Sequence, residues 1–328
     1  MIKLFLKILR KVYSKISNKP AGPILPIEMH VSDDDASKMI YDILMDDKPC
    51  MIARYGSFEL NTMLNARDVL NGKHQYLEYI KGNNLGWWWN QKLLNHMENN
   101  AGFFPITEEN ILRYSKRMFD DTTQLDILGS FARNERLIYK ELQGVKRIHL
   151  KQLEPFFGRT PWTRALKGRK VLVVHPLASL IEQQYKEHRE KLFNDEDILP
   201  EFELLAIPAV QSLGGRSDKF KDWFEALEWM EQEIDKVNYD ICLIGCGAYG
   251  FCLAAHVKRM GKKAFHLGGV LQILFGIKGA RWEDVNYNVE EWSIPRGFYA
   301  NKMNEYWVKP SSIDIPKNAQ AVEGGCYW

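Results

Sequence analysis

Short runs of consecutive apolar residues alternate along this chain with longer segments in which apolar residues recur every three or four positions. The short runs are typical of buried strands, and the longer segments have the periodicity of helices packed on one face. The expected strands are residues 49–54, 125–128, 170–174, 202–207, 241–244 and 264–267, and the expected helices are residues 33–45, 107–119, 179–193, 221–237 and 249–260. Strands alternating with helices predict an α/β fold, here a Rossmann-like, mostly parallel sheet with helices on both faces.

The first 19 residues differ from the rest of the chain in charge. They contain six basic residues and no acidic residue, whereas the remainder has 38 basic and 42 acidic residues and a net charge of −4. Residues 2–16 also place apolar side chains on one helical stripe, which predicts a basic amphipathic helix. We expect residues 1–19 to attach the protein to an anionic membrane surface; the alternative is a helix docked on the body of the protein or on a partner.

The rest of the chain is expected to form one catalytic domain, residues 30–328, after a linker at residues 20–29 that contains three prolines. Five cysteines without a CxxC pair indicate reduced thiols, so we expect a cytoplasmic protein, peripheral on the inner face of the membrane. A basic tip on an acidic body lacks the broad positive face that nucleic acid requires, and we expect no nucleic-acid partner.

A glycine turn follows the apolar run at residues 241–244. Gly245, Gly247 and Gly250 have GxGxxG spacing, and the expected helix directs its positive end at the turn, so an anion is the natural ligand. A dinucleotide site would place an acidic residue at the end of the next strand, where this chain has His266 and Gly268. The pattern predicts a nucleotide or phosphate crevice and no NAD site; the alternative is that the glycines only allow strand and helix to pack closely.

A second candidate binding loop lies in residues 51–60, MIARYGSFEL, where an apolar run leads into polar residues. Loops at the carboxyl ends of strands bind the ligands of open α/β sheets. Arg54 can bind phosphate through two N–H groups, and Glu59 can coordinate a divalent metal or accept a proton. The alternative is that Arg54 and Glu59 form an ion pair with each other.

Other segments add candidate ligand contacts. His175 ends an apolar run and titrates near neutral pH, which makes it the candidate general base, or else a hydrogen-bonded structural residue. Ser179, near the next helix start, can bind phosphate. The three tryptophans at residues 87–89 suit stacking on a sugar or base, with core packing as the alternative. Arg216, in a loop at residues 211–216, is a candidate diphosphate ligand, and we expect residues 307–328 to fold back onto the body.

These motifs resemble those of the GT-D-fold glycosyltransferases, a family of bacterial polysaccharide and glycan biosynthesis. The family signature is a strand ending in Arg-Phe/Tyr-Gly-Asp-Gly-Glu, with a later strand, glycine-rich turn, helix and strand before a glycine pair. Residues 241–269 resemble the later motif, and the resemblance covers the order of elements over residues 30–280. The first motif is matched by Arg54, Tyr55, Gly56 and Glu59, while Ser57 replaces the Asp and Phe58 the second Gly.

The resemblance implies a hexosyltransferase that moves a sugar from a nucleoside-diphosphate donor, expected to be UDP-linked, to a lipid-linked or glycan acceptor. We expect Glu59 and His175 to be catalytic, with Glu59 also the candidate ligand for Mn²⁺ or Mg²⁺, although Ser57 removes a carboxylate and leaves metal dependence open. The expected donor-binding residues are Arg54, Gly56, Ser57, Ser179, Gly245, Gly247, Tyr249, Gly250, His266 and Gly268.

Two other functions remain open from the sequence. The first is a non-catalytic nucleotide-binding or scaffold subunit of a polysaccharide-assembly complex, which the replacement at Ser57 makes conceivable. The second is an S-adenosylmethionine-dependent methyltransferase, because a glycine turn after a strand also binds that cofactor. In that fold, however, the turn usually follows the first strand, whereas here it comes late in the chain.

Overall fold

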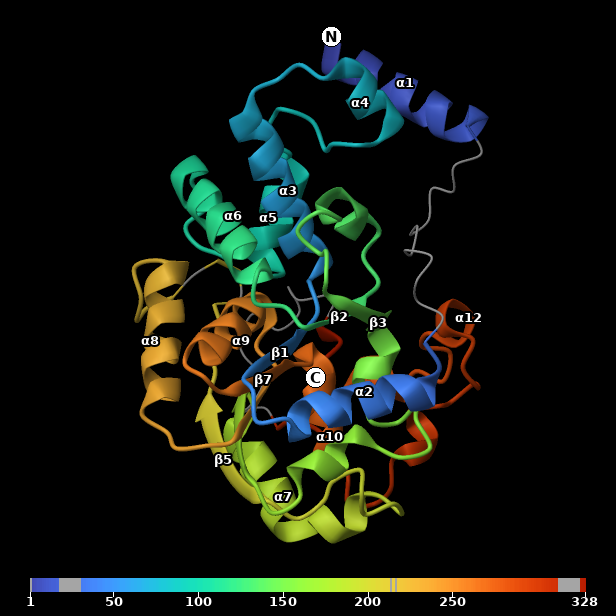
Figure 1. Cartoon of the computed structure of the whole chain (residues 1–328), viewed down its shortest axis with the longest axis vertical. Helices are drawn as coiled ribbons and strands as arrows, with labels where there is room; N and C mark the ends of the chain where they lie inside the picture. The colour runs from blue at the N-terminus through green and yellow to red at the C-terminus, as the bar shows by residue number, and fades with distance from the viewer. Residues whose placement is uncertain (1, 18–30, 213, 216, 312–324) are drawn as a thin grey trace.

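The computed structural model describes residues 2–17, 31–212, 214–215, 217–311 and 325–328. Within them, seven strands form one parallel sheet in the order β3-β2-β1-β7-β6-β4-β5 (Figure 1). The strands are β1 (Cys50–Ala53), β2 (Ile127–Ser130), β3 (Lys146–His149), β4 (Lys170–His175), β5 (Glu203–Pro208), β6 (Ile241–Ile244) and β7 (Lys263–His266).

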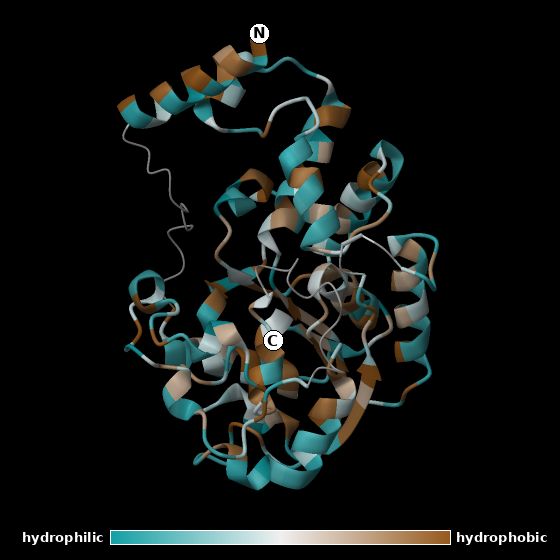
Figure 2. Cartoon of the chain, turned by 180° about the vertical axis from the view of Figure 1, so that it is seen from behind, coloured by the Kyte–Doolittle hydropathy of each residue, from teal (hydrophilic) through white to brown (hydrophobic). Residues whose placement is uncertain are grey.

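Helices cover both faces of this sheet, which confirms the predicted α/β architecture. Successive strand residues point to opposite faces, so Leu172 of β4 belongs to one apolar core and Val173 to the other. The first core is covered by α3 (Ser57–Asn71), α5 (Gln91–Asn99), α6 (Glu108–Thr122), α8 (Trp223–Asp235) and α9 (Gly250–Arg259). The second is covered by α2 (Asp33–Met45), α7 (Ala178–Leu192) and α10 (Leu271–Leu274). Figure 2 shows hydrophobic strands between helices whose outer faces are hydrophilic.

Several predicted elements occur with nearly the expected bounds. The helix predicted at residues 33–45 is α2, and the run at residues 241–244 is β6. Thr107 caps α6 as predicted, because its hydroxyl accepts a hydrogen bond from the Asn110 N–H at 3.1 Å. The sequence patterns missed β3, whose four residues include only one fully buried apolar side chain, Ile148.

The remaining elements are short, apart from α1. They are α1 (Ile2–Ile16), α4 (Tyr76–Lys81), α11 (Ala280–Glu283) and α12 (Val289–Trp292), with 3₁₀ turns η1 (Arg133–Ile138), η2 (Leu150–Leu153), η3 (Trp162–Leu166), η4 (Gly247–Tyr249), η5 (Gly268–Val270) and η6 (Ala300–Lys302). The predicted N-terminal helix is thus present as α1, and it packs on α4 at one pole of the molecule (Figure 1). Among the described helices, none has both the length and the apolar character to cross a bilayer.

The structure describes only parts of the segments that flank the main body. The predicted linker at residues 20–29 and most of the tail, residues 312–324, lie outside the described residues. Residues 325–328 do fold back on the body, since the backbone N–H of Arg281 donates to the Cys326 carbonyl at 3.1 Å. All five cysteines are free thiols, as predicted.

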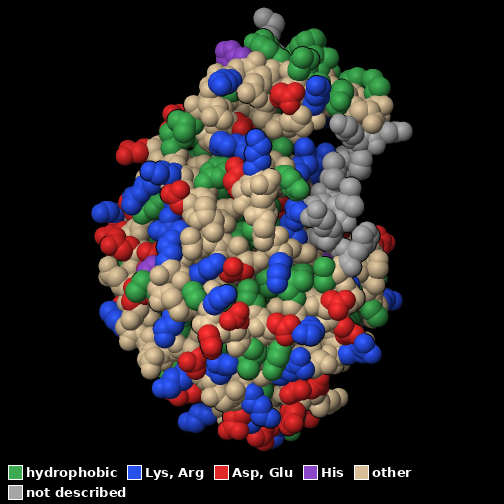
Figure 3. All heavy atoms as spheres, viewed as in Figure 1, with side chains coloured by type: hydrophobic (Ala, Val, Ile, Leu, Met, Phe, Trp, Pro, Cys, Tyr) green, Lys and Arg blue, Asp and Glu red, His purple; other side chains and the backbone are tan. Residues whose placement is uncertain are grey.

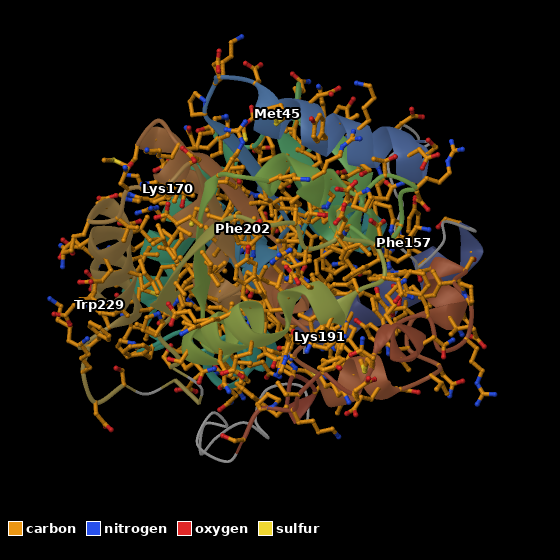
Figure 4. All side chains as sticks on the ribbon, turned by 90° about the horizontal axis from the view of Figure 1, so that it is seen from below. Met45, Phe157, Lys170, Lys191, Phe202 and Trp229 are labelled. Carbon is orange, nitrogen blue, oxygen red and sulfur yellow. The ribbon has the colours of Figure 1, made fainter. Side chains whose placement is uncertain are left out.

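The outer surface of the main body is polar. Charged side chains of both signs are interspersed over the face seen in Figure 3, below the α1–α4 pole. In the view from below, Met45 of α2, Lys191 of α7 and Trp229 of α8 mark three helices that surround the sheet (Figure 4). Loops from many segments meet at the carboxyl ends of the strands.

Candidate functional site

The carboxyl ends of four neighbouring strands form one cavity. Arg54 follows β1, His266 ends β7, Gly245 follows β6 and His175 ends β4, and all four residues line a cavity of about 470 Å³. The chain order reverses here, because β2 and β3 lie on one side of β1 and β7 lies on the other. Such switch points are the usual ligand sites of open α/β sheets.

Ten of the twelve predicted site residues line this cavity. They are Arg54, Gly56, Ser57, Glu59, His175, Gly245, Gly247, Tyr249, His266 and Gly268. Ser179 does not, because it lies on the exposed side of α7, in the first turn of that helix. Gly250 does not either, since it is buried at the start of α9 against the His266 ring.

Arg54 brings a positive charge into the cavity. Its side chain runs along Gly268 and holds its guanidinium 5.0 Å from the centre of the Phe131 ring. Among the described residues, no carboxylate lies within 4.0 Å of the guanidinium, so the suggested ion pair with Glu59 is wrong. A guanidinium without a carboxylate in direct contact is suited to bind an anionic ligand.

Glu59 lies in the first turn of α3. Its carboxylate is folded over Gly56, where a Cβ would overlap the carboxylate atoms, so a larger residue at that position would displace the Glu59 side chain. Burial raises the pKa of the Glu59 carboxyl, against the opposing effects of its own backbone N–H and of Arg54. A carboxylate with a raised pKa is a stronger base than an exposed one.

Two buried histidines differ in the nitrogen that carries the proton. The Leu177 N–H donates to Nδ1 of His175 at 3.0 Å, which assigns the proton of the neutral ring to Nε2. His266 instead donates from Nδ1 to the Ile244 carbonyl at 3.3 Å, which leaves its Nε2 as an acceptor. Burial lowers the pKa of both rings to about 3, with Arg54 adding to the effect on His266.

These assignments correct the role predicted for His175. The side chain is only 4% exposed and keeps an N–H at Nε2, so it can donate a hydrogen bond but cannot accept a proton there. The sequence reasoning assumed an exposed imidazole that titrates near neutral pH. Glu59 is therefore the better candidate for a base.

Glycine occupies the three positions of the turn for different physical reasons. A Cβ on Gly245 would lie 2.7 Å from the Gly268 carbonyl oxygen, and one on Gly250 would overlap the His266 ring. Close packing accounts for both. Gly247 has φ +55° and nothing within 4 Å of its Cβ position, so its backbone is open to the cavity. Only Gly247 keeps the predicted role of admitting a ligand to the backbone.

Tyr249 is held in place by its neighbours. Its hydroxyl donates to Ser212 Oγ at 2.7 Å, because that oxygen already donates to the Gly102 carbonyl at 2.6 Å. The ring stacks on Trp223 at 4.9 Å between centroids. Tyr249 thus borders the cavity but is tied into the core, and it positions the turn that carries Gly247.

Aromatic residues that the sequence did not single out complete the cavity wall. They include Phe131, Tyr287 and Trp292, together with Tyr327 and Trp328 at the end of the sequence. Phe131 follows β2 on a loop held by Glu135, which accepts from the Ala132 N–H at 2.9 Å. Arg281 donates to the Tyr327 hydroxyl at 3.2 Å and so joins α11 to residues 325–328. The aromatic residues near the end of the sequence were the available signal for this wall.

Two other predicted ligand segments lie elsewhere. Trp87 packs among His74, Tyr76 and Tyr79, and Trp88 lies below Lys3 of α1, so these rings support the α1–α4 pole and do not line the cavity. Gln211 and Ser212 do line it. Arg216 lies outside the described residues.

The cavity does not fit a metal held by protein ligands alone. Its described carboxylates are Glu59 and the exposed Glu291, and within the described ranges no group of three His, Cys, Asp or Glu side chains is placed to hold an ion. The predicted role of Glu59 as a metal ligand is not supported by this donor set.

The chain was compared with protein-family models, curated proteins and solved structures. No protein-family model matches the chain, and no curated protein or solved structure matches it.

Proposed function

We propose that the protein is a glycosyltransferase that moves a sugar from a nucleoside-diphosphate donor, UDP-linked in our preferred assignment, to a lipid-linked or glycan acceptor. The observation that carries the proposal is Arg54, whose guanidinium has no carboxylate partner among the described residues and faces the glycine loops of β6 and β7. A volume of about 470 Å³ lies within the range of sites for small molecules and cofactors. The aromatic wall offers surfaces for stacking on a base or sugar ring.

The donor diphosphate would occupy the space between Arg54 and the open backbone at Gly247. His175 would donate from Nε2 to a phosphate oxygen, and the cavity wall at Phe131 and Trp292 would contact the base or sugar. These contacts match an anion with an attached ring system. They distinguish the site from a purely apolar pocket.

In the transfer step, the acceptor hydroxyl oxygen forms a bond to the anomeric carbon while the bond from that carbon to the diphosphate breaks. The hydroxyl proton passes to the Glu59 carboxylate, and the electron pair of the broken bond leaves with the nucleoside diphosphate. Arg54 offsets the charge that develops on the leaving group. We route no step through a metal ion, because the donor set does not fit one.

The scaffold hypothesis is the second candidate, and one observation favours it. Ser57, in the position of the family Asp, lines the cavity, and no cluster of three metal-ligating side chains occurs in the described ranges. This version of the protein would bind the nucleotide without transfer. We place either version in the cytoplasm, at the inner membrane face, where the basic residues 1–19 would hold it near its acceptor.

A binding and turnover experiment tests these alternatives. The protein is screened by thermal shift against UDP, GDP, CMP, TDP, NAD and S-adenosylhomocysteine, each with and without Mn²⁺, and a nucleotide that stabilises it is then supplied as its sugar conjugate. At about 100 times its dissociation constant, a true ligand adds about 2.7 kcal/mol to the free energy of unfolding. Stabilisation with donor turnover supports the transferase, and stabilisation without turnover supports the scaffold. A response to S-adenosylhomocysteine alone would favour the methyltransferase.

A further inference from the structure

A second cavity lies at the α1–α4 pole, away from the first. It has a volume of about 460 Å³ and is enclosed by α1, α4 and η1. Six basic side chains line it, and no Asp or Glu is among the described residues of its wall. They are Lys7, Arg10, Lys11, Lys81, Arg133 and Arg136.

Polar atoms in this cavity lack partners. Arg136 Nε and Ser17 Oγ are buried, and neither has a hydrogen-bond partner in the described part of the chain. Burial, followed by the charges of Arg133 and Arg10, lowers the pKa of Arg136. Buried polar groups are nearly always satisfied in folded proteins, so the two unpartnered atoms and the clustered basic side chains suit an anionic ligand.

Arg10 and Arg136 are held in this cavity by hydrogen bonds to uncharged groups. Arg10 donates to the Asn84 carbonyl at 3.0 Å and lies 4.8 Å from the centre of the Tyr79 ring. Arg136 donates to the Gly82 carbonyl. Lys81 lies 3.7 Å from Glu78, an i,i+3 pair on the exposed side of α4. Carbonyl groups and a ring therefore orient Arg10 and Arg136, whereas Glu78 offsets part of the charge of Lys81.

Exposed apolar side chains are concentrated at the same pole of the molecule. Arg10 of α1 contacts the body and Leu6 is buried, while the apolar face of the helix points outward. Of the thirteen large apolar side chains that are well exposed among the described residues, nine lie at this pole. They are Ile2, Leu4, Phe5, Ile8, Val12, Ile16, Leu70, Tyr76 and Leu77. Figure 2 shows the hydrophobic residues of α1, and Figure 3 shows apolar and basic side chains together at the same pole.

We infer that this pole, formed by α1, α4 and the end of α3, docks on an anionic lipid bilayer, with one lipid phosphate in the cationic cavity and the apolar side chains in the interface. Apolar surface beside clustered Lys and Arg is complementary to a bilayer, which offers both hydrocarbon and phosphate. The inference goes beyond an attachment through residues 1–19, because it adds Leu70, Leu77 and a defined head-group site. It does not depend on sugar transfer, which a soluble acceptor can test separately.

Vesicle co-sedimentation of the full chain tests the docking surface. The protein should sediment with vesicles of phosphatidylcholine and phosphatidylglycerol but not with phosphatidylcholine alone. The variant Phe5→Ser/Ile8→Ser should lose this binding, whereas Met260→Ser, at a residue 53% exposed on another part of the surface, should keep it. Equal binding to both vesicles, or no binding, would overturn the inference. A wild-type dimer that Phe5→Ser/Ile8→Ser converts to a monomer would do so too.

A matched pair of variants tests the cavity itself. Lys7→Gln/Lys11→Gln and Lys3→Gln/Lys15→Gln remove the same charge from the same helix, but only the first pair lines the cavity. One kcal/mol per basic residue near the membrane corresponds to about a 5-fold loss of partitioning each, or about 25-fold for two. Lys7→Gln/Lys11→Gln should therefore lose more than about 25-fold in partitioning, and Lys3→Gln/Lys15→Gln should lose no more than about 25-fold. Equal losses of vesicle binding in the two pairs would rule out the head-group site. Binding of inorganic phosphate without binding of vesicles would contradict docking on a bilayer.

Discussion

Replacing Arg54 by Gln should weaken nucleoside-diphosphate binding while leaving the fold stable. A hydrogen bond to a charged group contributes about 1.5–3 kcal/mol, which corresponds to a rise in the dissociation constant of about 10- to 150-fold. In the protein itself, the guanidinium has no ion pair among the described residues, and its main aromatic contact is Phe131. Loss of a cation–π contact costs about 1 kcal/mol or less, so the melting temperature should move by about 2 °C.

Titration calorimetry with UDP, or with the nucleotide found in the screen, measures this change at fixed ionic strength. Arg54→Lys should give an intermediate affinity, because lysine keeps the charge but loses the planar pair of donors. Arg159→Gln is the matched control, since Arg159 is 90% exposed and pairs with Asp34 outside the cavity. An unchanged affinity in Arg54→Gln would refute the assignment of the diphosphate to this residue. A large loss of stability would show that Arg54 is structural.

Three further predictions use variants that preserve shape. Glu59→Gln should lower sugar transfer at least about 100-fold in a donor-turnover assay. It should keep or raise the melting temperature at neutral pH, because burial opposes the ionised carboxyl. Normal turnover in this variant would show that Glu59 is not the base. His175→Asn keeps an acceptor for the Leu177 N–H but loses the Nε2 donor, so calorimetry should show weaker nucleotide binding without loss of stability. Burial raises the pKa of Glu154 to about 8 from 4.5, so its contribution to stability should be complete below pH 4.5 and be lost as the pH rises toward 8, and Glu154→Gln should remove this part of the pH dependence of the melting temperature.

The sequence predicted the centre of the fold because its signals there are local. The run Ile241–Ile244 is buried on both faces, and a glycine turn must follow where the loop after β7 passes within packing distance of Gly245. Parallel strands bring their carboxyl ends to one edge, so Arg54, Gly245 and His266 were expected to meet. β3 gave no such signal, because its sequence KRIH buries Ile148 alone among its apolar positions.

Side-chain chemistry within the site was harder to predict. The tautomer of His175 depends on the backbone N–H of Leu177, and its low pKa depends on burial. The type of residue alone predicts neither feature. Arg281 and Tyr327 reach the cavity through short elements with no periodic pattern. The tryptophans at residues 87–89 suggested a surface for sugar stacking, but Trp87 and Trp88 pack near α4 and α1, and Trp89 packs against the first core.

The helix α3 also acts as a spacer of fixed length. It begins at the cavity with Ser57 and ends beside Leu70 at the pole, and Figure 1 shows it running between them. Its 15 residues span roughly 22 Å at 1.5 Å per residue, more than twice the Debye length of about 8 Å at physiological ionic strength. If the pole docks on a bilayer as proposed, a diphosphate in the cavity would be screened from the repulsion of anionic lipids. On the proposed function, an acceptor group attached directly to a lipid phosphate would fall short of the cavity, and the length of α3 would favour acceptors carried on an extended stem.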